Sequence, residues 1–185
     1  MLGSLDKNFK FKKINNFLNE EEIKLFSHYS KMKHRWSFGE IIEDNISPFE
    51  NSYYADFFTE SFLLTKRERM EKELNIILLP TYSYYRLYAY GAELFPHQDR
   101  PSCEISVTVM VDSDGTPWPF YADGQEFILE KGEAVIYKGC EVTHFRKKFK
   151  GDWHSQIFLH YVDAHGPYAE FAGDKRTMIG QQKLK

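Results

Sequence analysis

Apolar positions follow a helical spacing up to about Pro80 and an alternating spacing after it. In the first part, Ile23, Phe26 and Tyr29 recur at intervals of three residues. They follow a run of acidic residues, which suits the positive N-terminal end of a helix. We therefore predict a first helix that begins in this acidic run. A second apolar stripe with a charged flank predicts another helix over about 54–74.

After Pro80, side chains of one kind recur at every second residue, as they do along a β-strand. One face of the first predicted strand carries tyrosines and an arginine: Tyr82, Tyr84, Arg86, Tyr88 and Tyr90. The alternation recurs over 104–111, and shorter strand-like stretches cover 125–129, 134–137 and 154–162. Short strands joined by glycine-containing turns, without helices between them, indicate an antiparallel jelly roll. We expect a mainly β (α+β) fold, a double-stranded β-helix with N-terminal helices packed on it.

A length of 185 residues fits a single domain, because it allows one substantial core but not two. Within residues 1–185 we expect three parts. They are an N-terminal helical buttress over 1–79, a jelly-roll core over 80–163, and a C-terminal tail or lid over 164–185.

Charge and composition exclude several classes of protein. The sequence has 24 Lys and Arg against 27 Asp and Glu, a net charge of −3, so it lacks the basic surface of a nucleic-acid-binding protein. We find no apolar run long enough to span a membrane, and no apolar stretch of a secretory signal. Its two cysteines, Cys103 and Cys140, form no CxxC pair, so we expect a reducing, cytoplasmic location. Aromatic residues reach 17%, which suits a dense core or a lined cavity.

The chemistry is concentrated after the tyrosine-rich strand, where His97 and Asp99 are two residues apart. Residues i and i+2 of an extended segment project to the same side, so the imidazole and the carboxylate can chelate one ion. Such a pair is common by chance. A further histidine, His144, follows a glycine-flanked strand and is expected at the rim of the same sheet. Two imidazoles and one carboxylate suit non-haem Fe(II) with open coordination positions, and a zinc site with the same ligands remains an alternative.

The stretch from 82 to 163 resembles the catalytic core of the Fe(II)- and 2-oxoglutarate-dependent dioxygenases, nearest to the prolyl 4-hydroxylase-like branch. The resemblance is carried by an ordered set of pieces: Tyr90-Gly91, His97-x-Asp99, the segment from Glu130 to Val135, and His144. It implies that His97, Asp99 and His144 bind Fe(II) and are the catalytic residues. It also implies that 2-oxoglutarate is the co-substrate, converted to succinate and CO2 by O2 while an unactivated C–H bond is hydroxylated. Ascorbate is an optional further cofactor.

The family also has a basic residue about ten positions after the distal histidine, which binds the far carboxylate of 2-oxoglutarate. Here that position holds His154, which can pair with a carboxylate only when protonated. Three arginines are alternatives, and the order we expect is His154, Arg86, Arg146 and Arg100. Arg86 would lie among the hydroxyls of Tyr88 and its neighbours, whereas Arg146 can equally belong to a solvated basic run.

Three further residues are candidates for binding. Tyr90 matches the tyrosine that precedes the metal pair in the family, and we expect it near the iron. Trp118, which lies between two prolines, either forms a flat surface that contacts the substrate or packs across the mouth of the barrel and closes it. Arg100, next to the metal pair, can hold an anionic substrate. The substrate class that the resemblance implies is a prolyl residue or an amino acid, either peptidyl or a small molecule.

Two other functions stay open: a zinc- or manganese-dependent jelly-roll enzyme, and a non-catalytic, cupin-like binding protein. Loss of a metal ligand would favour the binding protein, but all three ligand positions are filled. Asp99 also argues against a halogenase, which by resemblance has a small residue there. The motifs of serine hydrolases, P-loop proteins and dinucleotide-binding proteins are missing. Oligomeric state is not indicated by the sequence.

Overall fold

A computed structural model describes residue 3, residues 5–36 and residues 50–180; the side chains of residues 35 and 36 are not included. Parts of the expected N-terminal buttress and residues 181–185 of the expected tail therefore lie outside the described residues. The elements, in chain order, are β1 (Phe11–Ile14), α1 (Glu20–Trp36), β2 (Glu50–Tyr54), α2 (Phe57–Leu74), β3 (Leu78–Ala89), β4 (Leu94–His97), η1 (Pro101–Cys103), β5 (Ile105–Ser113), β6 (Phe120–Ala122), β7 (Gln125–Phe127), β8 (Ala134–Tyr137), β9 (His144–Arg146), β10 (Trp153–Asp163) and η2 (Ala169–Lys175).

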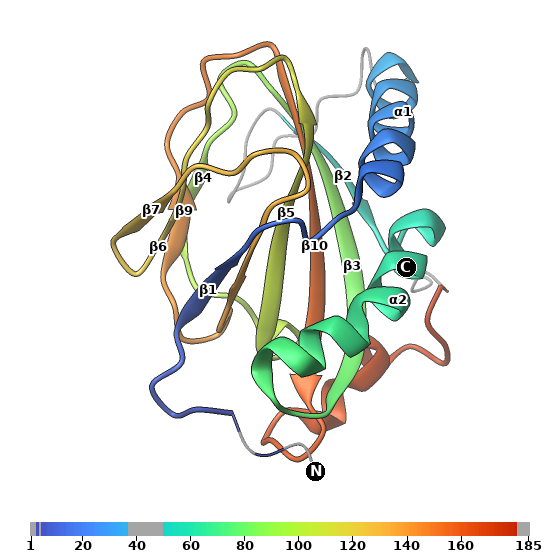
Figure 1. Ribbon diagram of the computed structural model, residues 1–185, viewed down its shortest axis with the longest axis vertical. Helices are drawn as coiled ribbons and strands as arrows, with labels where there is room; N and C mark the ends of the chain where they lie inside the picture. Colours follow the sequence, from blue (N-terminus) through green and yellow to red (C-terminus); the bar gives the residue numbers. More distant parts are fainter. Residues whose placement is uncertain (1–2, 4, 37–49, 181–185) are drawn as a thin grey trace.

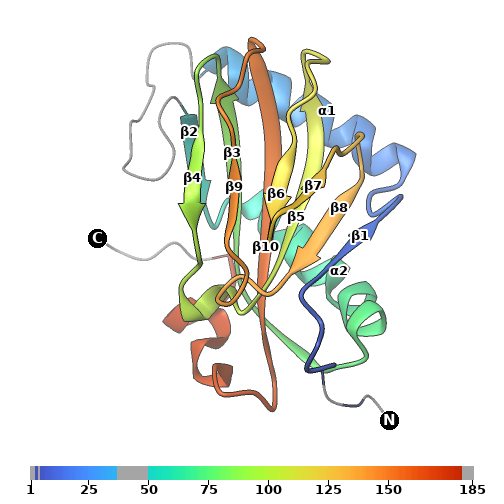
Figure 2. The ribbon, with the colours of Figure 1, turned by 90° about the vertical axis from the view of Figure 1, so that its left-hand side faces the viewer.

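Two antiparallel sheets face each other. One has six strands in the order β1-β8-β5-β10-β3-β2, and the other has four in the order β4-β9-β6-β7. Figure 2 shows the four-stranded sheet in front of the six-stranded sheet, with the strands of the two layers overlapping in the view. The mainly β, jelly-roll fold expected from the alternating pattern is confirmed.

Both long helices cover the outer face of the six-stranded sheet, the face turned away from the four-stranded sheet (Figure 1). A capping box starts α1: the Glu22 amide donates to Asn19 Oδ1 and the Asn19 amide donates to Glu22 Oε2, each at 2.9 Å. Asp56 caps α2 by accepting a hydrogen bond from the Phe58 amide. The second helix therefore begins at Phe57 and not at residue 54, because Tyr54 is still paired to β3.

The alternation along β3, β5 and β10 separates an apolar face from a polar one. Residues such as Tyr85, Val107 and Leu159 pack with Phe26 and Leu63 of the helices in the main core. The opposite faces of the same strands carry hydroxyl, imidazole and guanidinium groups and look into the space between the sheets. A smaller core around Phe120 fills part of that space. What remains is a partly polar interior, and the candidate site lies there.

After β10 the chain turns back as η2, which packs on β3 and β10. Asp174 of η2 is buried and accepts hydrogen bonds from Arg100, Ser102 and Tyr54. This segment is thus held against the sheet close to the metal pair. Among the described residues, no helix has the length and apolar character needed to cross a membrane.

Candidate metal centre

His97 and His144 come together because β4 and β9 are antiparallel neighbours in which these two residues are direct partners. Their ring centroids are 4.3 Å apart. The Nε2 atoms of His97 and His144 lie 3.6 Å and 3.7 Å from Asp99 Oδ1. One ligand atom from each residue can be chosen so that all three lie within 4.8 Å of one another. Atoms bound to one ion at about 2.1 Å are separated by distances of this order.

Backbone carbonyls orient both imidazoles. His97 Nδ1 lies 2.7 Å from the Phe95 carbonyl oxygen, and His144 Nδ1 lies 2.9 Å from that of Val142. A carbonyl can only accept, so Nδ1 carries the proton on each ring and Nε2 presents its lone pair toward Asp99. This arrangement on the far side of the ring is typical of metal-binding histidines.

Asp99 is placed by the backbone, since its amide donates to the Gly139 carbonyl at 2.8 Å. A Cβ atom at Gly139 would lie 2.2 Å from the Cys103 carbonyl oxygen and 2.7 Å from Asp99 Oδ2, so this close approach requires glycine. Burial would raise the pKa of Asp99, but the neighbouring imidazoles hold it below its ordinary value. Burial also lowers the pKa of His144. A charged carboxylate and a neutral imidazole are the protonation states that bind a metal.

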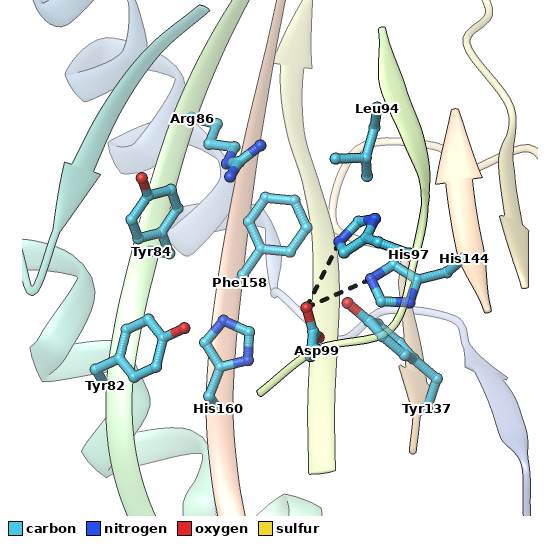
Figure 3. A pocket seen from close by; sticks show the side chains of 10 residues that line it. All are labelled: Tyr82, Tyr84, Arg86, Leu94, His97, Asp99, Tyr137, His144, Phe158 and His160. Atoms are coloured by element: carbon cyan, nitrogen blue, oxygen red, sulfur yellow. Dashed lines mark ion pairs between the residues drawn. The ribbon is translucent and has the colours of Figure 1, made fainter. Parts of the chain in front are cut away.

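The triad forms one wall of a pocket whose opposite wall comes from β3 and β10 (Figure 3). The residues that line it are Tyr82, Tyr84, Arg86, Leu94, His97, Asp99, Tyr137, His144, Phe158 and His160. An ion held by the triad would therefore lie in a pocket whose opposite wall is largely aromatic and carries one guanidinium group.

Arg86 is the only arginine among the lining residues in the part of the chain that the structure describes. Figure 3 shows its guanidinium group reaching over the pocket from β3. Its Nη1 lies 2.9 Å from Glu50 Oε2, and the Glu50 side chain is 2% exposed. Arg86 therefore lies in the cavity, on the face of β3 that the alternation of the sequence predicts for it.

His154 and Tyr88 lie deeper, outside the lining of this pocket. The His154 ring packs between Trp118 and Phe149, with centroids 5.2 Å and 5.9 Å away, and its Nε2 is 2.8 Å from Gln156 Oε1. Burial, assisted by the charge of Arg146, lowers the pKa of His154 to about 3. The ring is consequently neutral near pH 7, and it lacks the charge needed to pair with a carboxylate.

The remaining arginines and aromatic candidates occupy different surroundings. Arg100 forms an ion pair with Asp174 at 2.6 Å and lies over the Tyr82 ring. Arg146 is buried against Trp118, whose indole nitrogen donates to the Lys147 carbonyl oxygen at 2.5 Å. These contacts place Trp118 inside the barrel as a packing residue. Tyr90, in contrast, is 66% exposed and does not line the pocket.

His160 and Tyr137 also line the pocket, although neither is among the candidates from the sequence. The Nδ1 atom of His160 lies 2.8 Å from Ser106 Oγ. Tyr137 points its hydroxyl toward the triad (Figure 3). Burial, with a smaller effect from Asp99, raises the pKa of Tyr137 well above its ordinary value, so the group stays a donor. The period-two alternation of β10 and β8 was the available signal for both.

Asp99, Cys103 and His160 form a second group with potential ligand atoms within 4.8 Å of one another. The Cys103 thiol is buried, lies 3.0 Å from the Tyr82 hydroxyl, and has a pKa raised well above its ordinary value by burial. Cys140 belongs to neither group and donates to the Arg100 carbonyl oxygen at 3.2 Å.

Comparison with known proteins identifies the fold. No model of a protein family and no curated protein sequence matches the chain. Solved structures do match. A prolyl-4-hydroxylase from Pseudomonas putida has a TM-score of 0.62 and 17% identity over 84% of this chain and 94% of the other. The viral collagen prolyl hydroxylase of Paramecium Bursaria Chlorella virus-1, solved as a 2OG complex, has a TM-score of 0.62 and 12% sequence identity, and the match covers 83% of this chain and 96% of the other. HygX from Streptomyces hygroscopicus, with nickel and 2-oxoglutarate bound, has a TM-score of 0.63 and 10% sequence identity, and the match covers 84% of each chain.

These similarities confirm the double-stranded β-helix fold that the sequence resemblance implied. Identities between 10% and 17% establish a common fold. The activity has to be argued from the residues of this chain, because one fold carries many functions.

Proposed function

We propose that this chain is an Fe(II)- and 2-oxoglutarate-dependent oxygenase that hydroxylates an unactivated C–H bond. The observation that carries the proposal is the convergence of His97, Asp99 and His144 on one pocket wall, with both imidazoles oriented by backbone carbonyls. Two nitrogen ligands and one carboxylate on one side of an ion match the facial arrangement of non-haem Fe(II) oxygenases.

The donor set fits the metal in charge as well as in geometry. Asp99 supplies one negative charge, and the two neutral imidazoles supply lone pairs without a change of protonation. Bound Fe(II) would supply the activation of O2, coupled to decarboxylation of 2-oxoglutarate to succinate and CO2, by which one oxygen atom enters the substrate. His97, Asp99 and His144 would hold the ion and leave the pocket side open.

For the co-substrate we place Arg86 ahead of His154. Arg86 lines the pocket and presents a permanent charge, whereas His154 lies outside the lining and is neutral near pH 7. Arg86 would orient the far carboxylate of 2-oxoglutarate from the wall opposite the triad. Arg100, like Arg86, has an acidic partner, but it does not line the pocket, and a role for it and for Trp118 in substrate binding stays a proposal.

The remaining lining residues would control access of water and the supply of protons. Tyr82, Phe158 and His160 present flat faces opposite the triad, which would exclude bulk solvent from the reacting centre. Tyr137, whose hydroxyl points toward the triad, would act as a hydrogen-bond donor in the pocket beside Asp99. These tasks require no movement of the chain, because the residues already line one cavity.

The substrate we propose is a prolyl residue or an amino acid, presented on a peptide or as a small molecule. Structural neighbours were solved with both kinds of compound: a hypoxia inducible factor peptide with a prolyl hydroxylase from Trichoplax adhaerens, and hygromycin B with HygX. We further propose that residues 1–185 act as a single domain, and that the protein works in the cytoplasm, where Cys103 and Cys140 would stay reduced.

Succinate formation tests the proposal. Metal-free protein is supplied with 2-oxoglutarate, air and one metal at a time: Fe(II), Zn(II) or Mn(II). We expect slow succinate formation with Fe(II) alone, even before the primary substrate is known. Activity with zinc or manganese, or binding of metal without turnover under any of these conditions, would favour the alternative of a cupin-like jelly-roll protein.

A further inference from the structure

Arg146 of β9 carries a buried charge that the metal site does not use. Its side chain is 1% exposed and lies over the rings of Trp118 and Phe120, 4.8 Å and 5.5 Å from their centroids. One nitrogen, Nη1, donates to the Trp118 carbonyl oxygen. The other two, Nε and Nη2, are buried and have no hydrogen-bond partner among the residues that the structure describes.

The other arginines near the site have acidic partners. Arg86 is paired with Glu50 at 2.9 Å, Arg100 with Asp174 at 2.6 Å, and Arg176 with Glu60 at 3.0 Å. Within the described part of the chain, no acidic side chain pairs with Arg146. An isolated buried charge is costly, and a guanidinium group cannot avoid the cost by losing its proton.

Arg146 lies next to the pocket. It follows His144 by two residues on β9, so both side chains project to the same side, and its partner on β4 is the lining residue Leu94. Two residues of a strand span about 6.6 Å, comparable to the length of a five-carbon chain. Arg146 lies over the Trp118 ring, and Tyr88 of β3 packs edge-on against the same ring with centroids 4.8 Å apart.

Among the described residues of this region, the charge of Arg146 is the one without a directly paired acidic side chain. Arg86 and Glu50 neutralise each other, and His154 contributes none, so the charge of Arg146 remains. One carboxylate would balance it. We infer that Arg146 determines the specificity for a dicarboxylate co-substrate, because its buried charge is neutralised only when the far carboxylate of that compound enters the pocket.

This inference rests on the proposed function and refines it. Arg86 would touch the carboxylate, whereas Arg146 acts from behind the pocket lining, across the buried interior of the barrel. It is therefore a positioning residue. Arg146 lies on β9, the strand of His144. The position on β10 at which the family resemblance predicts a basic residue is occupied by His154, which is neutral near pH 7.

The test uses Arg146→Met, which keeps a long side chain and removes the charge. We expect the metal-free, ligand-free variant to melt above the wild type, because removal of an unpaired buried charge is stabilising. In anaerobic Fe(II)-loaded protein, we expect the affinity for 2-oxoglutarate to fall about tenfold or more. The affinity for 2-oxobutyrate, which has the same chelating end and no far carboxylate, should change little. Arg146→Lys, which keeps the charge, should retain the preference for 2-oxoglutarate.

A residue with only a structural role would behave differently. Arg146→Met would then melt below the wild type or fail to fold, and any loss of affinity would be equal for the two oxo acids; either result overturns the inference. If the wild type binds neither Fe(II) nor 2-oxoglutarate, the proposed function itself fails. If the wild type binds both and Arg146→Met keeps full preference for 2-oxoglutarate, only the role of Arg146 fails.

Discussion

His97 and His144 are direct partners across the antiparallel strands β4 and β9, although a long stretch of chain separates them. Their rings face Asp99 with Nε2 because the Phe95 and Val142 carbonyls accept from Nδ1. The site is thus preorganised by backbone pairing, and a metal ion would meet ligands that are already oriented.

Removal of either ring should therefore abolish metal binding without unfolding the protein. For His97→Ala and His144→Ala we expect the affinity for Fe(II) or Mn(II) to fall by more than about a hundredfold, measured by anaerobic equilibrium dialysis. His165→Ala, at an exposed turn, is the matched control and should bind like the wild type. Equal binding by the control and both variants would mean that the ion is held elsewhere.

Gly139 provides a test of the backbone contact that positions Asp99. A methyl group there would collide with the Cys103 carbonyl oxygen and with Asp99 Oδ2. We expect Gly139→Ala to lower the free energy of unfolding by about 1–3 kcal/mol, and to weaken metal binding because Asp99 is displaced. Urea denaturation and metal titration measure the two effects. A stable variant with normal metal affinity would show that the backbone at Gly139 does not position Asp99.

Variants of the buried pair of Arg86 and Glu50 distinguish an effect on co-substrate binding from an effect on stability. Arg86→Met removes the ion pair of the buried Glu50 carboxylate, so we expect a loss of about 3–5 kcal/mol in the free energy of unfolding, together with weak 2-oxoglutarate binding. The double variant Arg86→Met/Glu50→Met should recover much of the stability and none of the affinity. Recovery of 2-oxoglutarate binding in the double variant would remove Arg86 from the site.

His154 makes stability depend on pH. Its pKa is about 3 when folded and near 6.5 when unfolded, so the unfolded chain takes up a proton first. The contribution of the neutral His154 ring to the free energy of unfolding is complete above pH 6.5, and it is lost as the pH falls toward 3. Between pH 6 and pH 4, the wild type should lose about 1.4 kcal/mol per pH unit more than His154→Gln in urea denaturation. His165→Gln serves as the control, and parallel pH profiles for His154→Gln and the wild type would exclude a buried neutral ring.

Asp174 should anchor the segment after β10. It is buried and accepts from Arg100, Ser102 and Tyr54, so Asp174→Ala removes an acceptor that these three donors share. We expect a loss of about 2–4 kcal/mol in the free energy of unfolding and faster proteolysis of the C-terminal segment. Glu170→Ala in the same element removes an exposed carboxylate and should change stability by less than about 0.5 kcal/mol. If Asp174→Ala is as stable and as protected as Glu170→Ala, this segment is not held by Asp174.

The sequence was informative where short-range periodicity decides the geometry. Alternation along β3 placed Arg86 and its tyrosine neighbours on one face, and the spacing of His97 and Asp99 placed two ligands together. The surroundings of the individual side chains were harder to predict. The neutral state of His154 follows from rings packed on it from other strands, and the ion pair of Arg86 needs Glu50 from β2, a strand that the spacing of residues did not reveal. Such long-range contacts leave no local pattern.

The helix boundary near Tyr54 shows the same limit. Aromatic residues at 53, 54, 57 and 58 suit a helix by spacing, yet Tyr53 and Tyr54 pair with β3 and Asp56 caps the helix that follows. Pairing with a distant strand outweighed local propensity.

The visible absorption spectrum of anaerobic protein tests the central claim most directly. Addition of Fe(II) and then 2-oxoglutarate to the metal-free wild type should produce a weak charge-transfer band, because the oxo acid would chelate an ion held by His97, Asp99 and His144. Asp99→Ala should show no band at the same concentrations. A wild type without the band, or an Asp99→Ala variant that keeps it, would contradict the assignment of these three residues as the metal site.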